Sequence, residues 1–167
     1  MNQVELNKKA WWDYLEESHK SLLLQSLKLL DREKESHQKF DDYSFVIFPA
    51  AKAYEGFLKK LFLDLGIINE RQYKGKHFRI GKALNPTLEE HLKNEDWIYQ
   101  NLISECNPSL PQILWDTWKT SRNTIFHWFP EMKDSISLIE AEERIQLIIT
   151  AIDKSFVECN IKVTSNK

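Results

Sequence analysis

Three polar side chains, Arg122, Asn123 and His127, stand in an aromatic segment that begins at Trp115 and ends before Pro130. On a regular α-helix Asn123 and His127, four residues apart, share a face, and the long Arg122 side chain flanks that face. A guanidinium is a permanent, forked donor that matches phosphate oxygens, and an imidazole exchanges protons near neutral pH. This pair of residue types suits phosphodiester chemistry.

A carboxylate that could join this pair is Glu55, which is followed by Gly56 in an apolar helical stretch. Lys52 and Lys59 flank Glu55 at i−3 and i+4, a spacing that most simply indicates a surface ion-pair ladder. Gly56 lowers helix stability, and one reason to tolerate it is the close approach of a ligand or another backbone. Glu55 is therefore a candidate third catalytic group, with Lys52 and Lys59 as candidate RNA contacts.

The segment 67–82 contains five cations and a single acid, Glu70, together with aromatic rings and two glycines. Cations beside stackable rings are typical of a surface that binds RNA. An ordinary solvated loop with a short hairpin is the equally weighted alternative. The candidate RNA-binding residues in this segment are Arg71, Lys74, Lys76 and Arg79.

The elements that must position these residues are helices, because apolar residues recur at three- and four-residue spacing. The fold class predicted is all-α: a bundle of about five helices with a basic loop between helices 2 and 3. Whether the first helix is interrupted near residues 17–21 stays an open question. Pro49 either kinks the second helix or marks its true start. The main helical stretches expected cover residues 7–35, 41–65, 97–106, 109–128 and 137–158.

The chain of 167 residues is expected to form one helical domain, 1–167, with an N-terminal helix within about 1–38 and a frayed tail at 162–167. Asp41 or Asp42 is expected to cap the second helix, and Gly66 to end it.

Composition and motifs narrow the function classes. The net charge of −2 excludes a generally basic coat, so any RNA contact must come from a local patch. No P-loop, dinucleotide turn or helical metal pair is present, and no cofactor or metal is predicted. Cys106 and Cys159 lie in no metal-ligand spacing, and two reduced thiols are favoured over a disulfide. Without an apolar signal or spanning segment, the protein is expected to be soluble and cytoplasmic.

The remaining histidines are assigned to the surface. His19 and His37 stand among charged and small polar neighbours, so both are predicted to be solvated. His77 is assigned to the basic segment and not to a metal site, since no second ligand stands at a useful spacing.

These features together resemble the HEPN superfamily, whose ribonucleases carry an Arg-x(4–6)-His motif. The motif here reads Arg122-Asn-Thr-Ile-Phe-His127, and the segment Phe48-Pro-Ala-Ala-Lys-Ala-Tyr-Glu-Gly-Phe-Leu-Lys-Lys60 is similar to a helix with a functional glutamate in the C-terminal HEPN domain of RNase LS-type (RnlA/LsoA) toxins. The likeness spans roughly residues 40–160.

The resemblance implies a metal-independent endoribonuclease of toxin–antitoxin or anti-phage defence type. Attack by the 2′-hydroxyl of the RNA would leave 2′,3′-cyclic phosphate and 5′-hydroxyl ends. His127 would move protons, Arg122 would hold the phosphate, and Glu55 would orient one of them or act as a second acid or base. Asn123 would position RNA or His127.

The resemblance also implies a homodimer in which both Arg–His motifs face one cleft, and a protein antitoxin as partner. Trp115, Trp128 and Phe129 fit such an interface, although core packing is the somewhat stronger reading for each ring. Two alternatives stay open: a non-catalytic HEPN-like module for dimerisation or partner binding, and an enzyme acting on a small phosphorylated molecule.

Overall fold

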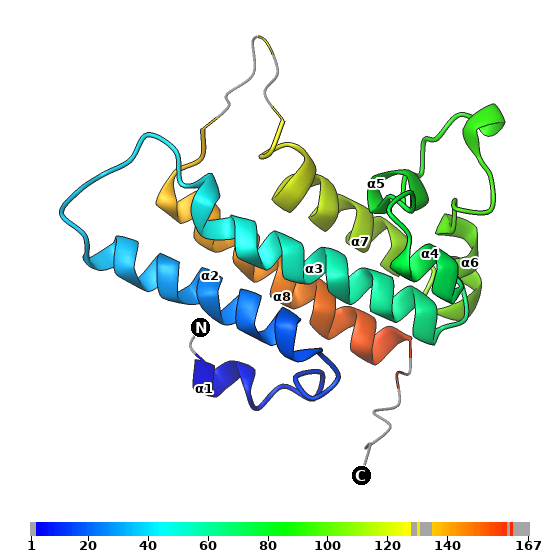
Figure 1. Ribbon diagram of the computed structural model, residues 1–167, viewed down its shortest axis with the longest axis horizontal. Helices are drawn as coiled ribbons and strands as arrows, with labels where there is room; N and C mark the ends of the chain where they lie inside the picture. Colours follow the sequence, from blue (N-terminus) through cyan, green and yellow to red (C-terminus); the bar gives the residue numbers. More distant parts are fainter. Residues whose placement is uncertain (1–2, 128–129, 131–134, 160, 162–167) are drawn as a thin grey trace.

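The fold is built on three long helices that lie side by side: α2 (Glu17–Glu35), α3 (Ser44–Asp64) and α8 (Leu138–Glu158) (Figure 1). The computed structural model describes residues 3–127, 130, 135–159 and 161. Over those residues the chain forms helices and turns and no strand. The all-α fold class is therefore confirmed.

Helix α3 is the central element, with α2 on one side and α7 (Leu110–Trp118) on the other (Figure 1). Its inward positions are fully buried, as at Tyr54, Phe57 and Leu58. Burial of apolar surface is the main force that holds a helix in a bundle, so α3 is a rigid support for the residues on its remaining face.

The ends of α3 confirm part of the prediction. The helix continues through Pro49 and begins before it, at Ser44. Asp42 accepts a hydrogen bond from the Ser44 backbone N–H at 3.1 Å, but Tyr43 occupies the N-cap position and no side chain caps the helix. Gly66 follows the helix with φ of 69°, a conformation that glycine adopts without strain.

The first predicted helix is correct only from Glu17 onward, because residues 7–15 form turns after the short α1 (Gln3–Leu6). Trp11 anchors these turns: its ring is buried and its indole N–H donates to the carboxylate of Asp153 on α8. Backbone hydrogen bonds between residues three apart close these turns, as from the Trp12 N–H to the Lys9 carbonyl at 2.9 Å, and the contact of Trp11 with α8 holds them against the bundle.

The prediction that His19 is solvated is wrong. Its side chain is packed in α2 against α3, with the residue only 7% exposed. A β-carbon added at Gly56 would lie 2.7 Å from Cδ2 of this imidazole, so the glycine makes room for it. Burial lowers the pKa of His19, against an opposing effect of Glu16. His37, in contrast, is exposed as predicted.

The segment 67–82 is not a loop, which corrects the prediction. It contains two short helices, α4 (Glu70–Lys74) and α5 (Ile80–Ala83). Asn69 and Gln72 form a reciprocal capping box at the start of α4, and Phe78 is buried. The cations still face outward: the exposed side chains are those of Arg71, Lys74, Lys76 and Arg79.

The prediction of two reduced thiols is also wrong, because Cys106 and Cys159 form a disulfide with their Cα atoms 4.5 Å apart. Each cysteine follows the end of a helix, α6 (Tyr99–Glu105) and α8 respectively. The bridge ties these two helix ends together across 53 positions of sequence.

The last helix agrees with its prediction: α8 follows Ser137, which forms a capping box with Glu140. The remaining elements are short, η1 (Glu90–Leu92) and η2 (Lys119–Asn123). The predicted frayed tail, 162–167, lies outside the described residues. None of the described helices is long and apolar enough to cross a membrane.

Candidate active site

The segment that carries the Arg–His motif departs from α-helical geometry at Lys119, just before Arg122. The predicted helix through residue 128 is wrong, because α7 ends at Trp118 and η2 is a single π-helical turn. The Thr124 N–H donates to the Lys119 carbonyl, five residues back, at 3.0 Å. π-Helical turns are rare and occur frequently at functional sites.

Contacts with α8 support this wide turn. Arg144 donates from Nη1 to the Thr120 carbonyl at 3.1 Å, and Ser121 is buried against the same helix, with its hydroxyl donating to the Arg144 carbonyl at 3.4 Å. The wide turn shifts the register of the residues that follow it. Residues 124–127 then form a turn and a bend and not a helix, so the shared helical face predicted for Asn123 and His127 is wrong.

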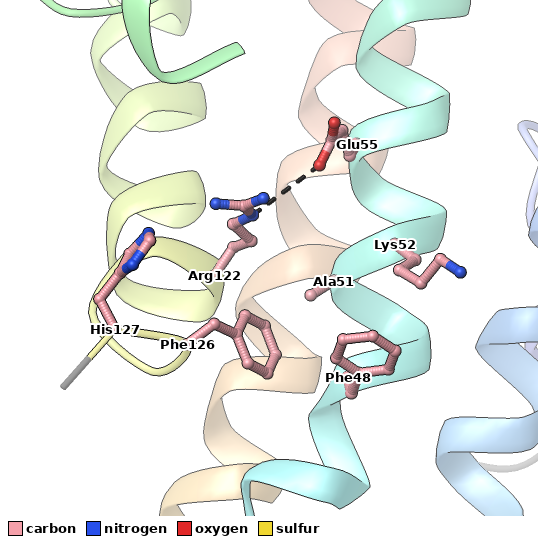
Figure 2. Close-up of a pocket in the computed structure, with 7 residues that line it drawn as sticks. All are labelled: Phe48, Ala51, Lys52, Glu55, Arg122, Phe126 and His127. Carbon is pink, nitrogen blue, oxygen red and sulfur yellow. Dashed lines mark ion pairs between the residues drawn. The ribbon is translucent and has the colours of Figure 1, made fainter. Parts of the chain in front are cut away.

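A pocket of about 330 Å³ lies between this turn and α3 (Figure 2). Two elements that are far apart in the sequence supply its walls. The lining residues are Phe48, Ala51, Lys52 and Glu55 from α3, with Arg122, Phe126 and His127 from the motif segment.

Arg122 and Glu55 face each other across this pocket (Figure 2), with Nε of the arginine 3.8 Å from Oε2 of the glutamate. Each side chain is 35% exposed, so the pair is open to solvent and its contribution to stability is small. Across the described part of the chain, neither Lys52 nor Lys59 pairs with Glu55. The predicted lysine ladder is therefore absent there, and the cation that Glu55 meets is Arg122.

The Arg122 guanidinium also rests on an aromatic base. Its central carbon lies 5.5 Å from the centre of the Trp118 ring, which stacks on Trp115 with ring centres 5.8 Å apart. A β-carbon at Gly81 of α5 would overlap the Trp118 ring, so this glycine lets α5 pack closely behind it. Trp115 thus supports the site within its own chain, while Trp128 and Phe129 lie outside the described residues.

Phe48 and Phe126 form an aromatic wall of the pocket, with ring centres 5.2 Å apart and planes at 90°. Neither ring was predicted to belong to the site. The sequence does contain a signal for Phe48. This residue stands seven positions before Glu55, so it lies on the same helical face, outside the apolar stripe of α3. The position of Phe126 had no such signal, since it depends on the turn that follows η2.

The structure therefore gathers four of the candidate residues at one pocket: Lys52, Glu55, Arg122 and His127. His127 is exposed at this pocket. The other candidates do not line it, and Lys74 pairs with Glu70 at 2.7 Å. Those outside the lining are Lys59, Arg71, Lys74, Lys76, Arg79 and Asn123.

The geometry defines a class first: an all-helical protein that places a guanidinium, a carboxylate and an imidazole at one solvent-open pocket. The family follows from a comparison, since a family model described as RnlA-toxin_DBD, "RNase LS, bacterial toxin DBD domain", matches residues 3–128. The chain belongs to this family. No curated protein and no solved structure matched the chain.

This match confirms the relation to RNase LS toxins and corrects its extent. It begins at residue 3 and not near 40, and it ends at 128, just after His127, so both motif segments lie inside it. The matched model describes a DBD domain and not a HEPN domain. The HEPN assignment therefore stays a prediction.

Proposed function

We propose that this chain is a metal-independent endoribonuclease of the HEPN type that acts in a toxin–antitoxin or anti-phage system. The observation that supports it most is the meeting of Glu55 and Arg122 at a pocket that His127 also lines. These three residue types can supply the acid, the base and the phosphate ligand that RNA cleavage by internal transesterification uses. The relation to RNase LS toxins agrees with this activity.

In the proposed reaction the 2′-oxygen of the RNA attacks the adjacent phosphorus. A bond forms between the 2′-oxygen and phosphorus, the bond from phosphorus to the 5′-oxygen breaks, and the products are a 2′,3′-cyclic phosphate and a 5′-hydroxyl. One proton leaves the 2′-hydroxyl and one reaches the departing 5′-oxygen. Because the nucleophile belongs to the substrate, the step does not need a metal-activated water.

His127 is the proposed acid or base, because imidazole has the pKa range best suited to proton transfer near neutral pH. Each cleavage moves two protons, so a second group is needed. Glu55 can act as that group, or His127 of a second subunit can, if two motifs face one cleft in a homodimer. His127 is exposed at the pocket of the single chain, which leaves it accessible to RNA there.

Arg122 is the proposed phosphate ligand. Its forked donors match phosphate oxygens and stabilise the extra charge of the transition state. The separation of 3.8 Å from Glu55 is longer than a charge-assisted hydrogen bond, so the carboxylate orients the guanidinium without saturating it. A phosphate entering the pocket can then replace Glu55 as the closer partner.

The test is cleavage of labelled single-stranded RNA in EDTA by the wild type, His127→Ala and Arg122→Ala, with His37→Ala as a matched control on the surface. The proposal is supported if the wild type and the control cut the RNA and leave cyclic phosphate ends, and if the cleavage rate of the two site variants is lower by about a hundredfold or more. Full activity in His127→Ala would overturn the assignment of this residue.

A second candidate is a non-catalytic module that binds a partner such as an antitoxin. The matched model describes one domain of a toxin, which is the observation in its favour. It predicts a stable complex with a protein partner and no RNA cleavage by the wild type at any pH from 5 to 9. The two candidates are separated by the wild-type cleavage assay alone.

A further inference from the structure

Phe48 is a large apolar residue that is exposed and does not belong to the buried core. The side chain lies on α3 at the pocket, yet the residue is 48% exposed, while the packing of α3 is provided by other residues. Its only ring partner among the described residues is Phe126, in an edge-to-face contact. A large part of an aromatic surface is therefore left open beside the groups proposed to cut RNA.

This open surface continues along the start of α3. Phe45 precedes Phe48 by three residues, and positions three apart are neighbours on a helix surface. Phe45 contacts Phe40 with ring centres 5.4 Å apart, and both are exposed. We call Phe40, Phe45, Phe48 and Phe126 the aromatic strip.

Cations accompany the strip at its pocket end. The Lys52 amine lies 5.7 Å from the centre of the Phe48 ring, and the described residues place no carboxylate in a salt bridge with it. Arg122 lines the same pocket. A ring with a cation beside it matches the two parts of a nucleotide, because the base stacks on the ring while the phosphate meets the charge.

We propose that the aromatic strip stacks unpaired bases of single-stranded RNA, with Phe48 holding the base next to the phosphate that is cut. The inference rests on the proposed ribonuclease function and names its substrate class. Bases in a duplex have both faces covered by their neighbours, so only an unpaired base can use this ring. Every base has such a face, so the contact selects for single strands and not for sequence.

A protein partner is the rival occupant of the strip. Lysine is depleted at protein–protein interfaces, whereas the Lys52 amine lies 5.7 Å from the centre of the Phe48 ring. The strip also runs into the pocket that holds the proposed catalytic groups. Both observations favour a nucleic acid.

The test measures binding of a labelled single-stranded RNA in the His127→Ala background, which prevents cleavage, with added Phe48→Ala, Phe48→Trp or Val157→Ala. Val157 is an exposed apolar residue near the end of α8 and serves as the matched control. We expect about tenfold weaker binding with Phe48→Ala, near-normal binding with Phe48→Trp, and no change with Val157→Ala. The same RNA annealed to its complement should bind weakly and equally to all variants.

Matching cleavage assays use the wild-type background, where Phe48→Ala should raise KM more than it lowers kcat. Unchanged RNA binding by Phe48→Ala, while Arg122→Ala still abolishes cleavage, would overturn the stacking inference and leave the ribonuclease function standing. The inference is also overturned if Phe48→Ala binds RNA like the wild type but no longer binds a protein partner that the wild type binds. Failure of the wild type both to cut and to bind RNA would remove the two proposals together. Thermal unfolding of each variant tests whether its fold is intact.

Discussion

Glu55 and Arg122 illustrate what single residues contribute here. Their side chains are 3.8 Å apart and each is 35% exposed, so the pair adds little stability, and we propose that its role is to orient the guanidinium. Other residues of the same region matter through packing: Gly56 admits the imidazole of His19, and Gly81 admits the ring of Trp118.

Replacing Glu55 by Gln should reduce RNA cleavage about tenfold and change the free energy of unfolding by less than about 1 kcal/mol, because the pair is exposed. Glu142→Gln is the matched control, since it removes another surface ion pair, with Lys34 at 2.6 Å. Cleavage rates and urea unfolding of both variants make the comparison. Equal rates for Glu55→Gln and Glu142→Gln would show that Glu55 has no part in the reaction.

Replacing Gly56 by Ala should destabilise the protein by about 1–3 kcal/mol, because the new methyl group overlaps the buried imidazole of His19. In a His19→Ala background the same change should cost much less, since the space is then free. Urea unfolding of the two single variants and the double variant gives the coupling. Additive effects would contradict the contact.

Stability should fall as the pH decreases below about 6.5, the ordinary pKa of histidine. Burial lowers the pKa of His19 in the folded state, with Glu16 opposing this and Lys60 adding to it. The unfolded state therefore binds the proton more readily, and protonation favours unfolding. Urea unfolding at pH 5.5 and 7.5 should show a smaller difference for His19→Gln than for wild type, while His37→Gln should keep the wild-type difference.

At the scale of elements, the site depends on the junction between a straight helix and a turn. Helix α3 holds Glu55 and Phe48 on one face, and the π-helical η2 changes the direction of the chain so that Arg122 and His127 reach the same pocket. Helix α8 stabilises that junction through Arg144. The opposite end of α8 is held by the disulfide between Cys106 and Cys159.

Reduction of the bond between Cys106 and Cys159 should lower the free energy of unfolding by about 2–4 kcal/mol, because the bridge closes a loop across 53 positions in the unfolded chain. Thermal unfolding with and without a reductant measures the effect. A double variant with serine at both positions should resemble the reduced wild type and ignore the reductant. A melting temperature that does not respond to reduction would contradict this contribution of the bridge to stability.

At the scale of the whole molecule, charge is distributed unevenly on a chain whose net charge is only −2. Exposed cations gather around α4 and α5, and Lys52 and Arg122 lie at the pocket. We propose that the first group contacts RNA beyond the cleaved bond, as its composition predicts. Contacts of this kind are electrostatic and independent of sequence.

Replacing Lys76 and Arg79 together by Glu should weaken RNA binding several-fold and make it less sensitive to salt, because fewer counterions are then released. Binding between 50 and 200 mM salt, in the His127→Ala background, measures the slope. Lys154→Glu on α8 is the control, since this lysine is exposed on another element. An unchanged slope in the double variant would place the RNA path elsewhere.

Much of the fold could be read from local pattern. The apolar spacing predicted α3, α6 and α8 within a few residues, the Gly66 stop was correct, and Arg122, His127 and Glu55 were singled out by their chemistry. These features depend on interactions within one or two helical turns, which is the range over which sequence alone determines structure.

The rest was decided by tertiary structure, because it depends on contacts between distant residues. The sequence could not show that Glu55 meets Arg122, that His19 is buried under Gly56, or that Cys106 reaches Cys159. The π-helical turn of η2 likewise depends on α8, which donates to the Thr120 carbonyl through Arg144. Sequence alone therefore determined α3, α6, α8 and the chemical groups of the site, whereas the packing of α3, η2 and α8 decided which of those groups share a pocket.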